Sequence, residues 1–162
     1  MERTFVMIKP DGVQRQLAGE VIKRFENVGL KLIGMKMLWV NKDFAAKHYT
    51  EDIAIRRGER VRSDAINYIT EGPVIAMVWE GIHTIDVVRK IVGTTESKSA
   101  APGTIRGDYT HMSFSYADAK KASIKNIIHA SGDAKDAAYE ISLWFTEKEL
   151  HSYKTVHEVH VY

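Results

Sequence analysis

The sequence has 162 residues and a mass of 18.4 kDa, which suits one domain with a real core, and it shows no internal repeat or domain boundary. Hydrophobic residues make up 44% and charged residues 27%, as in ordinary globular proteins, and a net charge of +2 gives no reason to expect specific nucleic-acid binding. Because the chain has no cysteine, disulfides and zinc–thiolate sites are excluded.

The first predicted strand covers residues 4–8, which are apolar without alternation, as in a central strand covered on both faces. It ends in the turn signal Lys9-Pro10-Asp11-Gly12. Apolar residues at helical spacing then predict a helix that ends at Gly29. A second strand is expected over 30–40, followed by a helix that starts near Asn41.

The middle of the chain begins with a basic stretch, 53–62, which we interpret as a solvated face. A helix is predicted over 64–70 and a buried strand over 74–81. The next helix is expected over 83–92. The longest apolar run, 74–79, is too short to cross a bilayer, and the amino terminus lacks a signal-peptide pattern, so we expect a cytoplasmic protein with no membrane contact.

Residues 94–125 are long and lack a periodic pattern, and loops of this length inside a compact domain are usually functional or disordered. A short strand follows and ends at His129. The last helix is expected to have an inner face made of Ala134, Ala137, Ala138, Ile141 and Phe145. Glu140 is expected beside that face. The tail, 146–162, has three irregularly spaced histidines and is expected to be a surface segment or an intersubunit contact rather than a metal site.

The order of these elements predicts a single α+β domain over 1–162, with a ferredoxin-like βαββαβ core, an antiparallel sheet and helices packed on it. A doubly wound α/β sheet is the alternative fold.

Polar residues gather at the strand ends and in the long loop. They are Lys9, Arg89, Thr95, Arg106, Asn126 and His129, with Tyr49 and Glu140 as supports. Cations and hydrogen-bond donors around one histidine describe a pocket for a polyanion such as a nucleoside triphosphate. Because no Walker glycine loop is present, side chains and a metal must hold the phosphates, and His129 is the candidate acceptor of a two-step, ping-pong transfer.

Several motifs in order resemble those of the nucleoside diphosphate kinase family. They are Lys9-Pro10-Asp11-Gly12-Val13-Gln14-Arg15, Gly72-Pro73-Val74 with Met77-Val78-Trp79-Glu80-Gly81, Pro102-Gly103-Thr104-Ile105-Arg106-Gly107-Asp108, Asn126-Ile127-Ile128-His129-Ala130-Ser131, and Glu140-Ile141-Ser142-Leu143-Trp144-Phe145. The resemblance covers most of the chain.

This resemblance implies a role for each matching residue. His129 is similar to the nucleophile that takes the γ-phosphoryl group through Nδ1, Glu140 to the carboxylate that orients it, and Ser131 to the hydroxyl bonded to that carboxylate. The residues that resemble phosphate ligands are Lys9, Arg89, Thr95 and Arg106, with Tyr49 near the transferred group and Lys9 and Asn126 at the ribose. The resemblance further implies Mg²⁺ carried mainly by the nucleotide phosphates, nucleoside tri- and diphosphates as partners, broad base selectivity, and a homo-oligomer that is a hexamer rather than a tetramer.

The chain also departs from the family pattern. Val61 stands where the family usually has a phenylalanine that stacks on the base, and Gly132 replaces an acidic residue. Residues 109–125 resemble an insertion, which we expect to be a surface excursion. Two other functions stay open at this level: a non-catalytic ATP-binding regulatory module, which would need the cations but not the nucleophile, and a protein-histidine kinase or scaffold that uses the same phosphohistidine.

Overall fold

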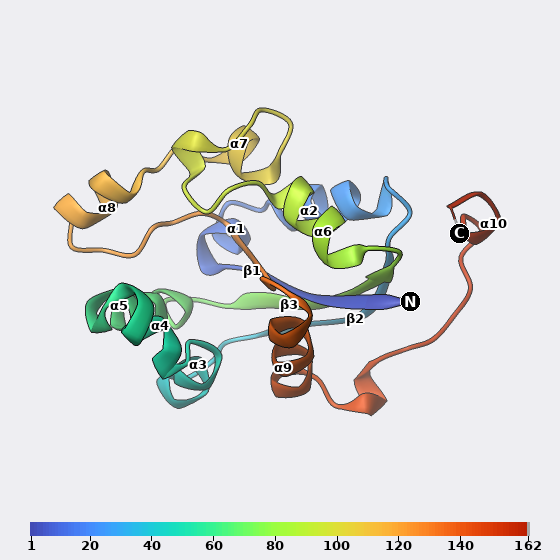
Figure 1. Ribbon diagram of the computed structural model, residues 1–162, viewed down its shortest axis with the longest axis horizontal. Helices are drawn as coiled ribbons and strands as arrows, with labels where there is room; N and C mark the ends of the chain where they lie inside the picture. Colours follow the sequence, from blue (N-terminus) through green and yellow to red (C-terminus); the bar gives the residue numbers. More distant parts are fainter. Residues whose placement is uncertain (162) are drawn as a thin grey trace.

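The computed structural model describes residues 1–161, so Tyr162 at the end of the predicted tail lies outside them. At its centre, four strands form one antiparallel sheet in the order β2-β3-β1-β4 (Figure 1). The strands are β1 (Glu2–Ile8), β2 (Lys31–Leu38), β3 (Val74–Gly81) and β4 (Ile128–Ala130). Because every neighbouring pair is antiparallel, the ferredoxin-like prediction is confirmed and the doubly wound parallel alternative is wrong.

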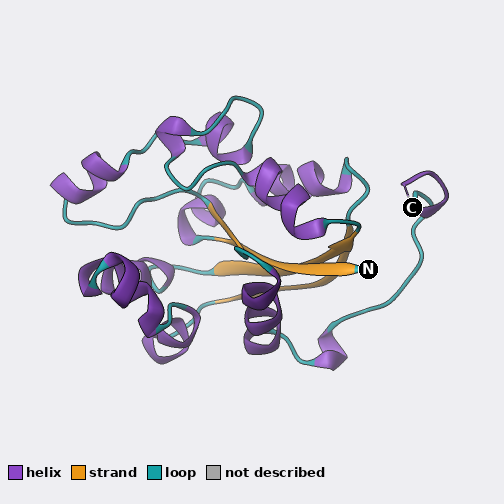
Figure 2. Cartoon of the chain, viewed as in Figure 1, coloured by secondary structure: helices purple, strands orange, loops and turns teal. Residues whose placement is uncertain are grey.

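Helices cover both faces of this sheet (Figure 2). One face packs against α2 (Ala18–Glu26), α6 (Thr84–Val92) and α7 (Ile105–Tyr109), and the other against α3 (Lys42–His48), α5 (Glu59–Ile69) and α9 (Ala134–Trp144). Side chains alternate along β1, so Val6 and Ile8 enter the first core whereas Phe5 and Met7 enter the second. This burial on both faces explains the unbroken apolar run in the sequence.

Three local predictions differ from the structure. The expected turn at Lys9–Gly12 is the start of the short helix α1 (Pro10–Gln14), because proline suits the first helical position. The helix predicted over 64–70 begins earlier, at Glu59, so the basic stretch 53–62 lies in α4 (Glu51–Arg57) and α5, on either side of Gly58 with φ of +95°. Most of this stretch is exposed, as expected of a solvated face. The long loop holds a 3-10 turn (Ser97–Ser99), α7 and α8 (Phe114–Ala119).

The edge strand β2 is only partly covered. After a 3-10 turn (Glu147–Glu149) the tail follows its first half, where the backbone N–H of His151 donates to the carbonyl of Ile33 at 2.8 Å, and the tail ends in α10 (Glu158–Val161). Beyond that contact Met35, Met37 and Trp39 are 54%, 60% and 67% exposed. A stripe of large apolar side chains on a sheet edge marks a surface for association. Among residues 1–161, no helix has the length and hydropathy that a membrane span needs.

Candidate active site

The short strand β4 places His129 opposite Met7 of β1, on the sheet face that α9 covers. The residue two positions before His129 has an unusual backbone. Ile127 is fully buried with φ of +70°, a region that β-branched residues rarely occupy. Its N–H donates to Asp11 Oδ2 at 3.1 Å, and its carbonyl accepts the N–H of Lys9 at 2.7 Å. The junction between β1 and α1 therefore holds the bend that leads into β4.

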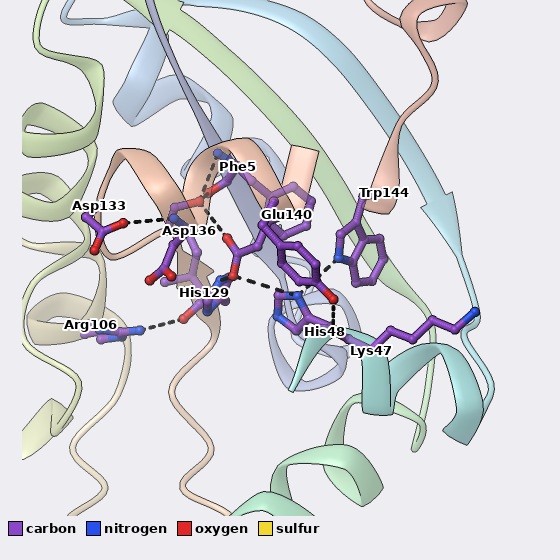
Figure 3. Close-up of polar contacts among 12 residues, drawn as sticks. Phe5, Lys47, His48, Arg106, His129, Asp133, Asp136, Glu140 and Trp144 are labelled. Atoms are coloured by element: carbon purple, nitrogen blue, oxygen red, sulfur yellow. Dashed lines mark hydrogen bonds and ion pairs between the residues drawn. The ribbon is translucent and has the colours of Figure 1, made fainter. Parts of the chain in front are cut away.

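Glu140 of α9 lies behind His129 and bonds its ring. Glu140 Oε1 is 2.7 Å from His129 Nε2 (Figure 3), and the hydroxyl of Ser131 donates to Oε2 at 2.6 Å. Burial, the largest influence, raises the pKa of the Glu140 carboxyl, but attraction to His129 and these hydrogen bonds together lower it below its usual value. An ionised Glu140 accepts the Nε2 proton, so the lone pair of the neutral His129 ring lies on Nδ1.

The inner face of α9 agrees in part with its sequence prediction, since Ala137 and Phe145 are buried and Ile141 packs on the core. Ala137, Glu140 and Trp144 are buried, whereas Ala134 and Ala138 are exposed. The prediction was wrong for Ala134, Ala138 and Glu140, because it placed the carboxylate at the edge of the apolar face. His129 and Ser131 supply the partners that make its burial tolerable.

Lys9 lies at the bottom of the site, at the junction between β1 and α1. Its ammonium donates to Asn126 Oδ1 at 2.8 Å, and Asn126 Nδ2 donates to the carbonyl of Thr95 at 2.9 Å. Burial first, and the charge of Arg106 second, lower the pKa of Lys9 from 10.5 to about 7, against an opposing effect of Asp11. A cation held at such cost is typical of a site that receives an anion.

Arg106 is buried and fixes the backbone around His129. Its guanidinium donates to the carbonyls of Ile128 at 2.7 Å, Gly93 at 2.9 Å and Asn126 at 3.4 Å. Burial, followed by the charge of Arg89, lowers its pKa to about 10, so Arg106 stays charged at neutral pH. It is therefore both a structural clamp and a cation beside the pocket.

A cavity of about 340 Å³ opens in front of His129. Eight of the ten predicted site residues line it: Lys9, Tyr49, Val61, Arg89, Thr95, Arg106, Asn126 and His129. The other two, Ser131 and Glu140, lie behind His129 and reach the cavity only through its ring. The size is within the range of small-molecule sites.

Residues 109–125 contribute a wall of this cavity that the sequence did not reveal. Phe114, Ala117 and Asp118 of α8 line it, together with Arg60 of α5, and Arg60 and Asp118 form an ion pair between the two helices. The segment is exposed along most of its length, as expected of a surface excursion, but the prediction missed its place at the pocket. A contact between segments so distant in sequence leaves no local signal.

The sequence also gave no role to His48 and Trp144. Trp144 Nε1 donates to His48 Nδ1 at 3.2 Å, and the same His48 atom lies 3.8 Å from Glu140 Oε1 (Figure 3). Ligand atoms of His48, His129 and Glu140 lie within 4.8 Å of one another, as in some metal sites. The hydrogen bonds from Trp144 and His129 already use lone pairs that a cation would need, so hydrogen bonding accounts for this cluster.

A family model described as nucleoside diphosphate kinase matches residues 2–150 of the chain. The chain belongs to the nucleoside diphosphate kinase family. It is 48% identical over 155 residues to a nucleoside diphosphate kinase of Borreliella burgdorferi, covering 95% of this chain and 93% of that one. Another, from Pyrococcus furiosus, is 48% identical over 153 residues, with coverage of 94% and 88%.

Solved nucleoside diphosphate kinases have the same fold. A transition-state mimic of the Borrelia burgdorferi enzyme, with bound vanadate and ADP, superimposes with a TM-score of 0.95 at 47% identity, covering 97% of this chain and 94% of that one. The Halobacterium salinarum enzyme in complex with CDP gives 0.85 at 39% identity, with coverage of 99% and 98%. As a member of the nucleoside diphosphate kinase family, the chain is a phosphotransferase that moves the γ-phosphoryl group of a nucleoside triphosphate to a nucleoside diphosphate. This membership favours the kinase over the non-catalytic ATP-binding module.

Proposed function

We propose that His129 carries the phosphoryl group between the two nucleotides on its Nδ1 atom. The observation that carries the proposal is the 2.7 Å contact between His129 Nε2 and Glu140, in a ring that faces the cavity. Nδ1 attacks the γ-phosphorus, the bond to the bridging oxygen breaks, and the nucleoside diphosphate leaves with that oxygen. The acceptor diphosphate then takes the group from Nδ1 by the reverse steps.

The cations around the cavity would hold the phosphates and neutralise the charge that develops during transfer. We assign this role to Lys9, Arg89 and Arg106, and propose that the neutral hydroxyl of Thr95 donates a hydrogen bond to the phosphates. Burial raises the pKa of the Tyr49 hydroxyl, which is therefore a proton donor available near the transferred group. Lys9 and Asn126, already bonded to each other, lie where ribose hydroxyls could join their network.

Mg²⁺ would accompany the nucleotide rather than occupy a protein site. Glu140 is the carboxylate next to His129, and its two oxygens already bond His129 and Ser131. Cations and neutral donors predominate in the lining of the cavity, and its carboxylates, Asp64, Asp118 and Asp136, come from three separate helices, with Asp118 paired to Arg60. The donor set thus fits an ion held by phosphate oxygens and water. When bound, Mg²⁺ would offset phosphate charge.

The base would lie at the cavity mouth, between Val61 of α5 and Phe114 of α8. Both side chains line the cavity and both are more than a third exposed. Aromatic faces bind all bases by stacking without reading their edges, which supports broad base selectivity. Phe114 thereby supplies an aromatic ring that Val61 cannot.

We also propose that the enzyme forms a homo-oligomer, a hexamer rather than a tetramer, in the cytoplasm. The exposed stripe of Met35, Met37 and Trp39 supports association, and the absence of cysteine is compatible with a reducing compartment. Sedimentation velocity measures the assembly directly, and a monomer at micromolar concentration would contradict it.

The decisive experiment is intact mass after brief incubation with MgATP and no acceptor. The wild type should gain one phosphoryl group, lose it on addition of GDP and regain it with fresh ATP, whereas His129→Ala should gain none. A wild type that binds ATP but gains no mass would refute the proposal.

A further inference from the structure

His48 of α3 is buried against the histidine to which we assign the chemistry. Its side chain is 1% exposed, and its ring centre is 4.7 Å from that of His129, with the two planes nearly perpendicular. The titratable groups that act on it are His129 of β4, Glu140 of α9 and Lys9, which lies between β1 and α1. The ring centre of Tyr49 is also 4.7 Å from that of His48. Burial, followed by His129, lowers the pKa of His48 to about 3, so the ring is neutral at physiological pH.

Trp144 determines which nitrogen of neutral His48 carries the proton. An indole nitrogen can only donate, so the 3.2 Å bond from Trp144 Nε1 requires a lone pair on His48 Nδ1. The proton must then be on Nε2. Among residues 1–161, His48 Nε2 has no hydrogen-bond partner. The fold thus accepts an unsatisfied buried donor, which is costly, in order to keep Nδ1 an acceptor.

The other tautomer of His48 would interfere with His129. His48 Nδ1 is 3.8 Å from Glu140 Oε1, the same oxygen that bonds His129 Nε2 at 2.7 Å. With a proton on Nδ1, His48 would need only a small ring movement to donate to that oxygen. Two donors would then share one carboxylate oxygen, and the hold of Glu140 on the His129 proton would weaken.

We propose that Trp144 is a positioning residue for phosphoryl transfer: its indole N–H fixes the Nε2–H tautomer of His48, which reserves Glu140 for His129 and keeps His129 Nδ1 unprotonated. The inference rests on the proposed role of His129 as phosphoryl carrier. Trp144 does not line the cavity and acts indirectly, through His48 and Glu140.

The test compares Trp144→Phe with the double variant Trp144→Phe/His48→Phe. Phenylalanine keeps an aromatic ring but has no donor, so His48 is released to bond Glu140. We expect kcat of the single variant to fall roughly tenfold with KM for the nucleotide little changed, as for other outer partners of an active group. Removing His48 as well removes the competitor, so the double variant should be several-fold faster than Trp144→Phe alone.

Trp79→Phe is the matched control. Trp79 is a fully buried indole on the opposite sheet face, packed on Phe25, and within residues 1–161 its ring stacks on neither His48 nor His129. It should lose stability but keep kcat. A purely structural role for Trp144 predicts that the double variant is as slow as the single one or slower, and that result overturns the proposal.

Tautomers measured in the wild type decide the matter even where a variant does not fold. In protein labelled with ¹⁵N-histidine, long-range ¹H–¹⁵N spectra should show His48 and His129 both protonated on Nε2. A proton on Nδ1 of His48 overturns the inference. Failure of the proposed function looks different: the wild type takes up no phosphoryl group from MgATP, whatever the tautomer of His48.

Discussion

Replacing Lys9 by methionine tests the cost of burying an ammonium group at the bottom of the pocket. Methionine is an unbranched side chain that can fill the space of the buried stem without a charge. Between pH 7 and pH 9 the unfolded chain keeps its proton on Lys9, whereas the folded chain, in which burial lowers the pKa from 10.5 to about 7, releases it. Because the unfolded state binds more protons over this range, the free energy of unfolding must rise with pH.

The size of the effect follows from the two pKa values. Between pH 7 and pH 9 the unfolded chain binds on average about 0.85 more protons than the folded chain. One proton changes the free energy of unfolding by about 1.36 kcal/mol per pH unit, so the change over the two pH units is roughly 2 kcal/mol. The wild type should therefore gain about 2 kcal/mol relative to Lys9→Met as the pH rises from 7 to 9. The penalty is fully present below pH 7, where Lys9 is charged in both states, and it is lost towards pH 10.5.

Urea denaturation at pH 7, 8 and 9 measures this difference, without nucleotide and at one fixed protein concentration. Lys23→Met, at an exposed lysine of α2, is the matched control and should follow the wild type. If wild type and Lys9→Met show the same change with pH, the ammonium of Lys9 is not strongly desolvated and the reasoning is refuted.

Three further outcomes are expected. Glu140→Gln keeps the shape of the side chain but loses its charge. Phosphorylation of His129 by ATP, measured in a single turnover by rapid quench, should therefore slow roughly 10- to 100-fold. An unchanged rate would show that the charge is not needed. Phe114→Ala should weaken ADP binding, measured by calorimetry, about tenfold, as the loss of one stacking contact implies. The control Tyr116→Ala, on the same helix but away from the cavity, should not weaken it. Equal effects of the two variants would show that Phe114 does not contact the base. Arg106→Met removes the guanidinium donor from three carbonyls, of which that of Asn126 keeps the N–H of Ile128, and should lower the free energy of unfolding by about 3 kcal/mol in urea at pH 7. A loss below about 1 kcal/mol would contradict its clamping role.

Much of the fold could be predicted because its signals are local. The apolar run of β1, the turn residues around it and the helical spacing in α2 and α6 each depend on neighbours in sequence. The helix α8 could not be predicted in the same way. Its contacts are with distant partners, among them the bond from the N–H of Phe114 to Glu96 and the ion pair between Asp118 and Arg60.

The features of the site also divide into those with a local sequence signal and those that depend on distant contacts. A strand-end histidine among cations suggested phosphate chemistry, and the resemblance supplied each role. The burial of Glu140 could not be predicted, because a charged side chain is not expected inside the core. Its pairing with His129 and Ser131, which is visible only in three dimensions, explains this burial. His48 and Trp144 could not be recognised, because a buried histidine on a helix is ordinary until its hydrogen-bond partner is known.

The left-handed backbone of Ile127 limits how far the histidine motif can be transplanted. Its bend is held by Asp11 and by the N–H of Lys9, residues more than a hundred positions away in the chain. A six-residue peptide copied from 126–131 onto another strand would relax to ordinary extended geometry and turn its imidazole elsewhere. An engineer who wants this nucleophile in a new scaffold must import the end of β1 and the start of α1 along with it.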